Sequence, residues 1–286
     1  MDKEQCGCED PEIKALLEEN RKEDEEAEAD RIASIKPMRI MIALPDNHAY
    51  FQKEFVDSLI NIQTDFYQWK IKNNSPHELS IVCKGSVCLD EARNSLVRLM
   101  IENDQTHIFF MDTDQTFLPE TVRLMIECFE GNPEVDAVTG LYTWKKAPFT
   151  PHLYGGYDKG KFFGASKFPL DELFEVQAAG TGVLMIKREV FERTKYPWFK
   201  FEFREDGSFK FGEDLYFFRK AKPLTICDPR NRCRHLKLEG YGLDDYLDSN
   251  GLKRIVTDEG HDRFEVTDEQ LKEIAEKHNA NTKHQL

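Results

Sequence analysis

The chain has 286 residues, of which 40% are hydrophobic and 12% aromatic, and its formal net charge is −14. This length and composition predict one large α/β domain or two small ones, and the negative charge argues against nucleic acid or an anionic membrane surface as the main ligand. We expect a cytoplasmic protein with free thiols, because no apolar run has the length of a membrane span, no secretory signal follows Met1, and the seven cysteines form no regular framework.

Residues 1–36 form an acidic segment that differs from the rest of the chain. They hold 13 acidic and 6 basic residues, a net of −7. Pro11 followed by strong helix formers predicts a helix over residues 11–35. After a short apolar stripe this helix is charged all round. We therefore expect either a solvated N-terminal extension or a helix through which the chain forms homo-oligomers.

Strands and helices alternate from residue 37 to residue 142. Apolar runs predict four strands, at residues 38–45, 79–85, 108–111 and 135–142. Helical spacing of apolar residues predicts three intervening helices, at residues 50–63, 88–104 and 119–129. This alternation predicts an α/β fold with a mostly parallel central sheet flanked by helices.

The regular pattern breaks at residues 143–172, where Pro, Gly and aromatic residues follow one another without a period. This segment is too long for an ordinary connection and predicts a β-hairpin excursion, a flexible substrate wall, or both. Beyond it we expect further elements in chain order: a strand at 183–186, a helix from 188, a helix at 211–222, strands at 224–228 and 232–238, and a capped helix at 267–278.

Two aspartates one residue apart, Asp112 and Asp114, follow the strand at residues 108–111. Sheets of this class bind ligands outside the carboxyl ends of their strands. Two carboxylates held close together repel each other, and a divalent cation with oxygen ligands relieves the repulsion. An EF-hand is excluded, because Phe117 stands where that loop needs glycine and Arg123 where it needs glutamate. The pair therefore predicts a metal site of another kind.

Three further motifs follow in order. Gly180-Thr181-Gly182 precedes the strand at 183–186, Gly212-Glu213-Asp214 begins a helix, and His235 lies in the last predicted strand. An Asp-x-Asp pair, a glycine turn, an x-Glu-Asp element and a late histidine in this order resemble the nucleotide-sugar-dependent glycosyltransferases of the GT-A fold, in particular the family 2-like enzymes of bacteria and phages. The resemblance covers about residues 38–240 and implies the GT-A fold for them.

The resemblance implies a role for each acidic residue and for the histidine. Asp114 would bind the metal directly, Asp112 would contact the ribose or a metal-bound water, and His235 would complete the protein ligands. Oxygen ligands with one imidazole suit Mn²⁺ or Mg²⁺. Asp214 is the candidate general base of an inverting transfer, and Glu213 would position the acceptor. The structural alternative for Glu213 and Asp214 is favourable charge at a helix N-terminus.

Other residues are expected to form the donor-binding surface. Pro45 ends the first strand close to the nucleotide, and Thr113 lies between the two aspartates. Gly180 and Gly182 would let the backbone approach the sugar closely, although an ordinary tight turn would need glycines as well.

Arg93 and four aromatic residues each admit two interpretations. Arg93 could reach the diphosphate or the base, or it could pair with Glu91 or Asp90 on the surface. The aromatic residues could stack on sugar faces, although about half are expected to be packing; they are Tyr142, Trp144, Tyr154 and Tyr157.

We therefore predict a metal-dependent glycosyltransferase that moves a sugar from a nucleotide-sugar, by resemblance a UDP-sugar, to an acceptor hydroxyl. The acceptor could be a glycan, a protein, a lipid carrier or a modified nucleobase. A retaining transferase and a non-catalytic nucleotide-sugar-binding scaffold are the alternatives. A sugar nucleotidyltransferase is disfavoured, because the loop after the first strand has no glycine to hold a nucleoside triphosphate. Residues 1–36, 37–240 and 241–286 are expected to be an N-terminal extension, the transferase domain and a polar tail with a terminal helix.

Overall fold

The computed structural model describes residues 21–22, 35–46, 51–86, 88–165, 167–236, 243–256 and 262–284. Apart from residues 21–22 and 35–36, the acidic extension lies outside the described residues. Its predicted helix and its predicted role in oligomerisation therefore remain predictions.

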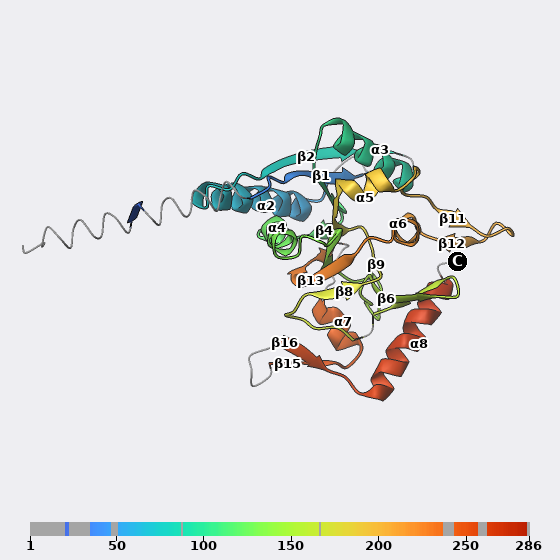
Figure 1. Ribbon diagram of the computed structural model, residues 1–286. Helices are drawn as coiled ribbons and strands as arrows, with labels where there is room; N and C mark the ends of the chain where they lie inside the picture. Colours follow the sequence, from blue (N-terminus) through green and yellow to red (C-terminus); the bar gives the residue numbers. More distant parts are fainter. Residues whose placement is uncertain are drawn as a thin grey trace, which may run out of the picture.

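A seven-stranded sheet forms the centre of the molecule, in the order β2-β1-β3-β10-β5-β13-β8 (Figure 1). Five strands run in one direction, and β10 and β8 run against them. The strands are β1 (Arg39–Pro45), β2 (Glu78–Lys84), β3 (His107–Met111), β5 (Ala137–Leu141), β8 (Phe174–Val176), β10 (Val183–Lys187) and β13 (Thr225–Arg232). The prediction of an α/β fold with a mostly parallel sheet is confirmed, and the architecture is compatible with the GT-A fold.

Helices cover both faces of this sheet. Side chains alternate along β1, so that Ile40 and Ile42 face one core cluster while Met41 and Ala43 face the other. The first cluster includes side chains of α2 (Lys53–Lys72) and α4 (Thr121–Gly131). The second includes side chains of α3 (Leu89–Glu102), α5 (Arg188–Arg193) and α6 (Glu213–Ala221). Each fully buried aliphatic or aromatic side chain contributes about 1.5–3 kcal/mol to this packing.

Several predicted boundaries differ from the structure, most clearly those of α2 and β13. Helix α2 continues to Lys72 rather than residue 63, because Phe66 extends the buried stripe one turn beyond Ile62. Strand β13 is continuous from Thr225 to Arg232, where two separate strands were predicted, and His235 lies in the short β14 (Arg234–His235).

The segment after β5 forms a β-hairpin, as one of its two interpretations predicted. Strands β6 (Leu153–Asp158) and β7 (Lys161–Gly164) pair antiparallel, and β9 (Ala178–Ala179) adds a third strand. Phe162 links this hairpin to a second one, β11 (Glu202–Phe203) with β12 (Phe209–Phe211), since its ring lies 5.9 Å from that of Phe211. The excursion returns the chain to the edge where β5 ended, which explains why β10 runs antiparallel to β5.

Several side chains of the C-terminal segment pack on the domain. It contains α7 (Leu243–Ser249), β15 (Lys253–Val256), β16 (Asp262–Glu265) and α8 (Asp268–His284). Tyr246, Phe264 and Ile274 belong to the same buried cluster as Met41 and Ala43 of β1. The predicted capping box of α8 is confirmed, with Gln270 N–H donating to Thr267 Oγ1 and Thr267 N–H donating to Gln270 Oε1.

Candidate active site

The predicted site residues gather at the carboxyl ends of the parallel strands. Asp112 directly follows β3, and its N–H donates to the carbonyl of Gly182, just before antiparallel β10 begins. Tyr142 directly follows β5, and its hydroxyl accepts the N–H of Gly182 at 3.2 Å. Asp46 directly follows β1. This is the edge of the sheet where ligands bind in folds of this class.

Backbone pairing brings His235 to the aspartate pair. After Asp114 the chain forms β4 (Gln115–Thr116), which pairs antiparallel with β14 so that His235 lies opposite Gln115. The N–H of Leu236 also donates to the carbonyl of Asp114 at 2.6 Å. A residue 120 positions away in sequence is thereby fixed beside the Asp-x-Asp motif.

Arg93 joins two of the predicted carboxylates. Its side chain is only 2% exposed; Nη2 donates to Asp112 Oδ1 at 3.0 Å and Nε donates to Glu213 Oε1 at 3.2 Å. The alternative of a surface pair with Glu91 or Asp90 is wrong, because Arg93 is buried and pairs with Asp112 and Glu213 instead. The guanidinium is held inside the site by two acidic partners that come from different elements.

The carboxyl group of Asp214 has a strongly perturbed pKa. Burial, followed by the neighbouring Glu213 carboxylate, raises its pKa to about 7, while the N–H of Leu215 and the charge of Arg93 act in the opposite direction. Part of the residue still reaches the surface. Gly212 makes room for this carboxylate, because an added Cβ would lie 2.7 Å from Asp214 Oδ1. Near neutral pH this carboxyl group can therefore exchange a proton.

His235 is a neutral imidazole with a defined tautomer. Its Nδ1 lies 2.5 Å from the carbonyl oxygen of Thr143, which can only accept, so Nδ1 carries the proton. Its Nε2 accepts from the Gln115 amide, 3.2 Å away. Burial lowers the pKa of His235, although the negative charges of Asp114 and Asp112 act to raise it. A ring that donates through Nδ1 and keeps a lone pair on Nε2 is typical of metal-binding histidines.

Asp114 forms an ion pair with Lys145, on the segment that follows β5. Across the described ranges, no three His, Cys, Asp or Glu side chains form a group that could hold a metal ion. The structure thus brings Asp112, Asp114 and His235 to one edge of the sheet without joining them as a ligand group. The chemistry of the donor set fits Mn²⁺ or Mg²⁺, but Asp114 would first have to release Lys145.

The glycine turn makes room for side chains of the site. An added Cβ at Gly180 would lie 1.8 Å from the Tyr142 hydroxyl, and one at Gly182 would lie 2.3 Å from Gln115 Nε2 and 2.8 Å from Asp112 Oδ2. The absence of a Cβ at these two glycines therefore lets the side chains of Tyr142, Gln115 and Asp112 lie close to the backbone of the turn. The approach of a sugar to this turn remains a prediction.

Pro45 and Thr113 lie beside a residue that sequence reasoning missed. Pro45 is buried at the end of β1. The hydroxyl of Thr113 donates to Asp46 Oδ1 at 3.4 Å, and both residues are buried. The signal in the sequence was available, since Asp46 is the first polar residue after the first apolar strand.

The aromatic residues divide between packing and exposure. Tyr142 and Tyr154 are each 3% exposed, whereas Tyr157 is 42% exposed. His152, which was not predicted, stacks between Tyr142 and Trp144, with ring centroids 4.8 and 4.1 Å away. The expectation that about half of these rings serve packing agrees with these exposures.

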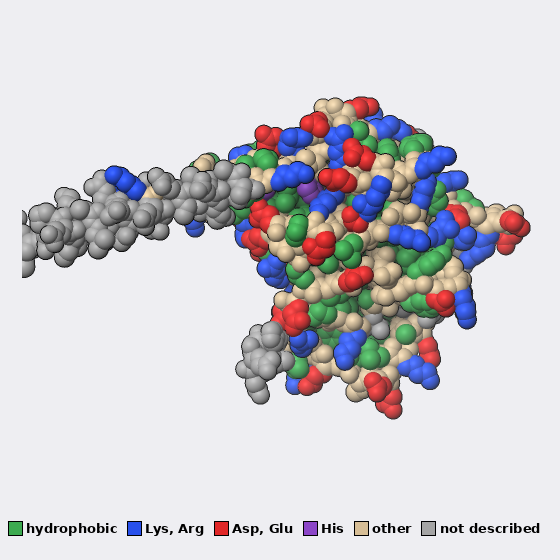
Figure 2. Space-filling view, in the orientation of Figure 1, with side chains coloured by type: hydrophobic (Ala, Val, Ile, Leu, Met, Phe, Trp, Pro, Cys, Tyr) green, Lys and Arg blue, Asp and Glu red, His purple; other side chains and the backbone are tan. Residues whose placement is uncertain are grey.

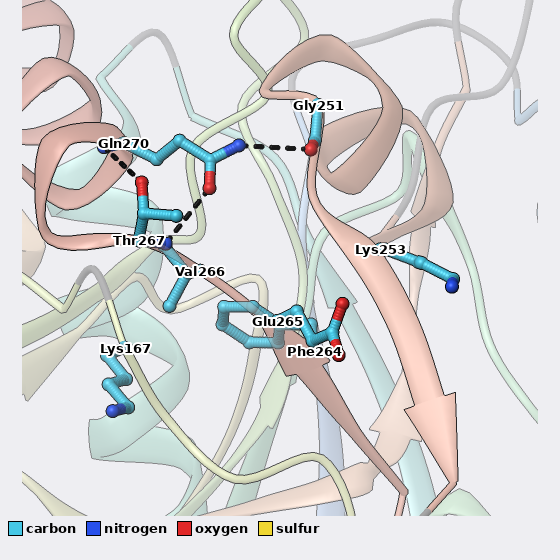
Figure 3. Close-up of a pocket in the computed structure, with 8 residues that line it drawn as sticks. All are labelled: Lys167, Gly251, Lys253, Phe264, Glu265, Val266, Thr267 and Gln270. Carbon is cyan, nitrogen blue, oxygen red and sulfur yellow. Dashed lines mark hydrogen bonds between the residues drawn. The ribbon is translucent and has the colours of Figure 1, made fainter.

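A hollow elsewhere on the molecule lies beside α8. Figure 3 shows Lys167 and Lys253 on either side of Phe264, below the cap of the helix. The polar groups at its rim bond to one another, since Gln270 bonds to Thr267 and also donates to the carbonyl of Gly251. It shares no residue with the carboxylate site. On the face of the molecule in Figure 2, basic and acidic side chains are interspersed rather than gathered into one acidic patch.

Comparisons with known proteins give a likeness of fold only. No protein-family model matches the chain, and the search of curated proteins gives no significant match. Among similar solved structures, A197 from STIV has a TM-score of 0.47 and 20% identity over 80% of this chain and 95% of that chain.

Two further structures show weaker likeness. S. aureus TarS 1–349 has a TM-score of 0.37 and 12% identity, covering 67% of this chain and 58% of that one. HddC from Yersinia pseudotuberculosis, complexed with GMP-PN, has a TM-score of 0.37 and 10% identity over 74% and 97% of the two chains. At these low TM-scores we infer function from the chain's own residues.

Within the described residues, no helix has both the length and the apolar character needed to cross a membrane.

Proposed function

We propose that this chain is a nucleotide-sugar-dependent glycosyltransferase that uses a divalent cation and inverts the configuration of the transferred sugar. The donor is a UDP-sugar, by the resemblance of its motifs to GT-A enzymes. The observation that carries the proposal is the cluster of Asp112, Glu213 and Asp214 around buried Arg93 at the carboxyl edge of the sheet. A carboxyl group with a shifted pKa at such an edge, here Asp214, is typical of catalytic sites.

Asp214 acts as the general base in this proposal. The acceptor oxygen attacks the anomeric carbon while its proton passes to the carboxylate of Asp214. The bond from the anomeric carbon to the diphosphate oxygen breaks, and its electron pair leaves with the nucleoside diphosphate. A base works best when its pKa lies near the operating pH, and a pKa of about 7 meets that condition.

Asp112, Asp114 and His235 would hold the divalent cation. When bound, this ion would neutralise the charge that develops on the leaving diphosphate. The neutral imidazole of His235 and the two carboxylates are suitable donors for Mn²⁺ or Mg²⁺. Glu213, fixed by Arg93, helps shape the acceptor side of the site.

The test is donor hydrolysis across UDP-, GDP-, ADP-, CMP- and dTDP-sugars, with and without Mn²⁺. We expect slow Mn²⁺-dependent release of UDP by the wild type and no release by Asp114→Ala. NMR of the sugar product with a working acceptor then separates inversion from retention. Release that is equal in the wild type and the variant would contradict the assignment of Asp114.

A non-catalytic nucleotide-sugar-binding scaffold is the second candidate. The observation in its favour is that both aspartates of the motif already carry a cationic partner, Arg93 and Lys145. A scaffold would bind UDP or a UDP-sugar without releasing or transferring the sugar in the presence of any acceptor class. Calorimetric binding together with silent transfer assays would therefore favour it over the enzyme.

A further inference from the structure

Asp112 pairs with Arg93 and Asp114 pairs with Lys145, and these two basic side chains differ in how freely they can move. Arg93 is 2% exposed, is tied to Glu213 as well as Asp112, and lies over the ring of Phe110 at 5.5 Å. The side chains of Lys145 and Asp114 are 35% and 33% exposed. The guanidinium is therefore a fixed part of the site, whereas the ammonium can leave its partner and enter solvent.

The backbone that leads into Lys145 is anchored at two consecutive residues. The carbonyl of Thr143 accepts a hydrogen bond from His235, and the N–H of Trp144 donates to the carbonyl of Thr150 at 2.9 Å. The backbone at Lys145 is therefore held in place, and the ammonium reaches Asp114 through a flexible four-carbon side chain. Displacement of the ammonium needs rotation of this side chain only, and the charge stays close to the site.

A divalent cation and the ammonium of Lys145 would meet at the same carboxylate. Two positive charges beside one carboxylate repel each other, so binding of one disfavours the other. The donor brings a diphosphate to this place, and lysine binds phosphate as a compact point charge.

We propose that Lys145 competes with the divalent cation for Asp114 and, once displaced, contacts the diphosphate of the donor. This inference rests on the proposed function. It makes Lys145 a donor-binding residue that also limits metal binding to the protein when no donor is present. The free protein would then bind the cation weakly, and the nucleotide would favour the exchange by giving the ammonium a new partner.

The test compares Lys145→Met with Lys146→Met in the full chain. Lys146 is the exposed neighbour on the same segment, so its replacement makes the same change in net charge. Calorimetry measures the Mn²⁺ affinity without nucleotide and then the UDP affinity at saturating Mn²⁺. Lys145→Arg serves as the conservative variant, because it keeps a cation at the position.

Lys145→Met should bind Mn²⁺ about two- to fivefold more tightly than Lys146→Met, the fold-change expected from loss of a partly exposed ion pair. It should bind UDP about tenfold more weakly at saturating Mn²⁺, because a charge-assisted hydrogen bond is lost. Lys145→Arg should stay close to the wild type in both measurements.

Three results would overturn the inference in different ways. Equal Mn²⁺ affinities for the two Met variants, with binding that still depends on Asp114, exclude the competition and leave the proposed function intact. Unchanged UDP affinity in Lys145→Met excludes the contact with the diphosphate. Absence of Mn²⁺ binding in the wild type and in Lys145→Met overturns the metal site of the proposed function together with this inference.

Discussion

Three carboxylates share one buried guanidinium, and this imbalance decides how they divide their roles. Arg93 bonds to Asp112 and to Glu213, and it reaches Asp214 only through its charge. Among the described residues, Asp214 lacks the direct ion pair with Arg93 that Asp112 and Glu213 have. Burial, followed by the neighbouring Glu213 carboxylate, raises the pKa of Asp214 to about 7, and the charge of Arg93 offsets only part of this rise.

Replacing Asp214 by asparagine should remove the base and leave donor binding unchanged. The wild-type kcat/KM should rise with pH through about 7, because only the ionised carboxylate accepts a proton. In Asp214→Asn the rate should fall by about 10²–10⁴-fold and this rise should disappear. Rate profiles from about pH 5.5 to 8.5 measure the effect, and calorimetry with UDP and Mn²⁺ measures binding.

Loss of UDP binding in Asp214→Asn would place Asp214 in the metal site instead. The stability of the variant gives an independent check. Because the pKa of Asp214 is raised in the folded state, the folded protein holds a proton between about pH 4 and about pH 7 that the unfolded chain has released. Wild-type stability from this group therefore falls as pH rises through that window, and Asp214→Asn should lack this fall.

At the scale of the elements, Arg93 connects three parts of the fold. It lies on α3 and bonds to Asp112 after β3 and to Glu213 at the start of α6. Arg93→Met should destabilise the protein by about 3–5 kcal/mol, because it leaves buried acidic groups without their cation. Urea unfolding measures this change.

The matched control is the double variant Arg93→Met/Glu213→Gln. It removes the most buried charge that Arg93 compensated, so it should regain part of the lost stability. A double variant no more stable than Arg93→Met would mean that the cost comes from lost packing against Phe110 rather than from unpaired charge.

Patterns within one element could be predicted from the sequence, and partners between distant elements could not. The apolar run of β3, the stripe of α3 and the capping box of α8 are local, and each predicted its element. The direction of β10 depends on the edge to which the preceding excursion returns the chain. The burial of the C-terminal segment depends on a surface that other elements form.

The candidate site divides in the same way. Asp112 and Asp214 were identifiable because each stands in a short motif at the end of an element. Lys145 carried no signal, since a lysine in an irregular segment is ordinarily a solvated side chain. Its pairing with Asp114 depends on how the chain leaves β5. The burial of Arg93 likewise depends on α6, whose Glu213 lies 120 positions away.

At the scale of the whole molecule, an ionisable side chain lies at each end of β3. Asp112 follows its carboxyl end, whereas His107 begins the strand at the far edge of the sheet. His107 is 7% exposed, its ring lies 4.8 Å from that of Phe129, and its Nε2 is buried without a partner among the described residues. Burial, with the charge of Lys187 next in importance, lowers its pKa to about 3.

Replacing His107 by phenylalanine should therefore stabilise the protein in acid and change little at neutral pH. A depressed pKa gives stability that is present above the unfolded value of 6.5 and is lost as pH falls, because only the unfolded chain takes up the proton. Between about pH 8 and about pH 5, His107→Phe should gain about 2 kcal/mol relative to the wild type in urea unfolding. Asp214 contributes a slope of opposite sign in both proteins, so it cancels in the difference. A constant difference in stability over this range would show that His107 titrates normally.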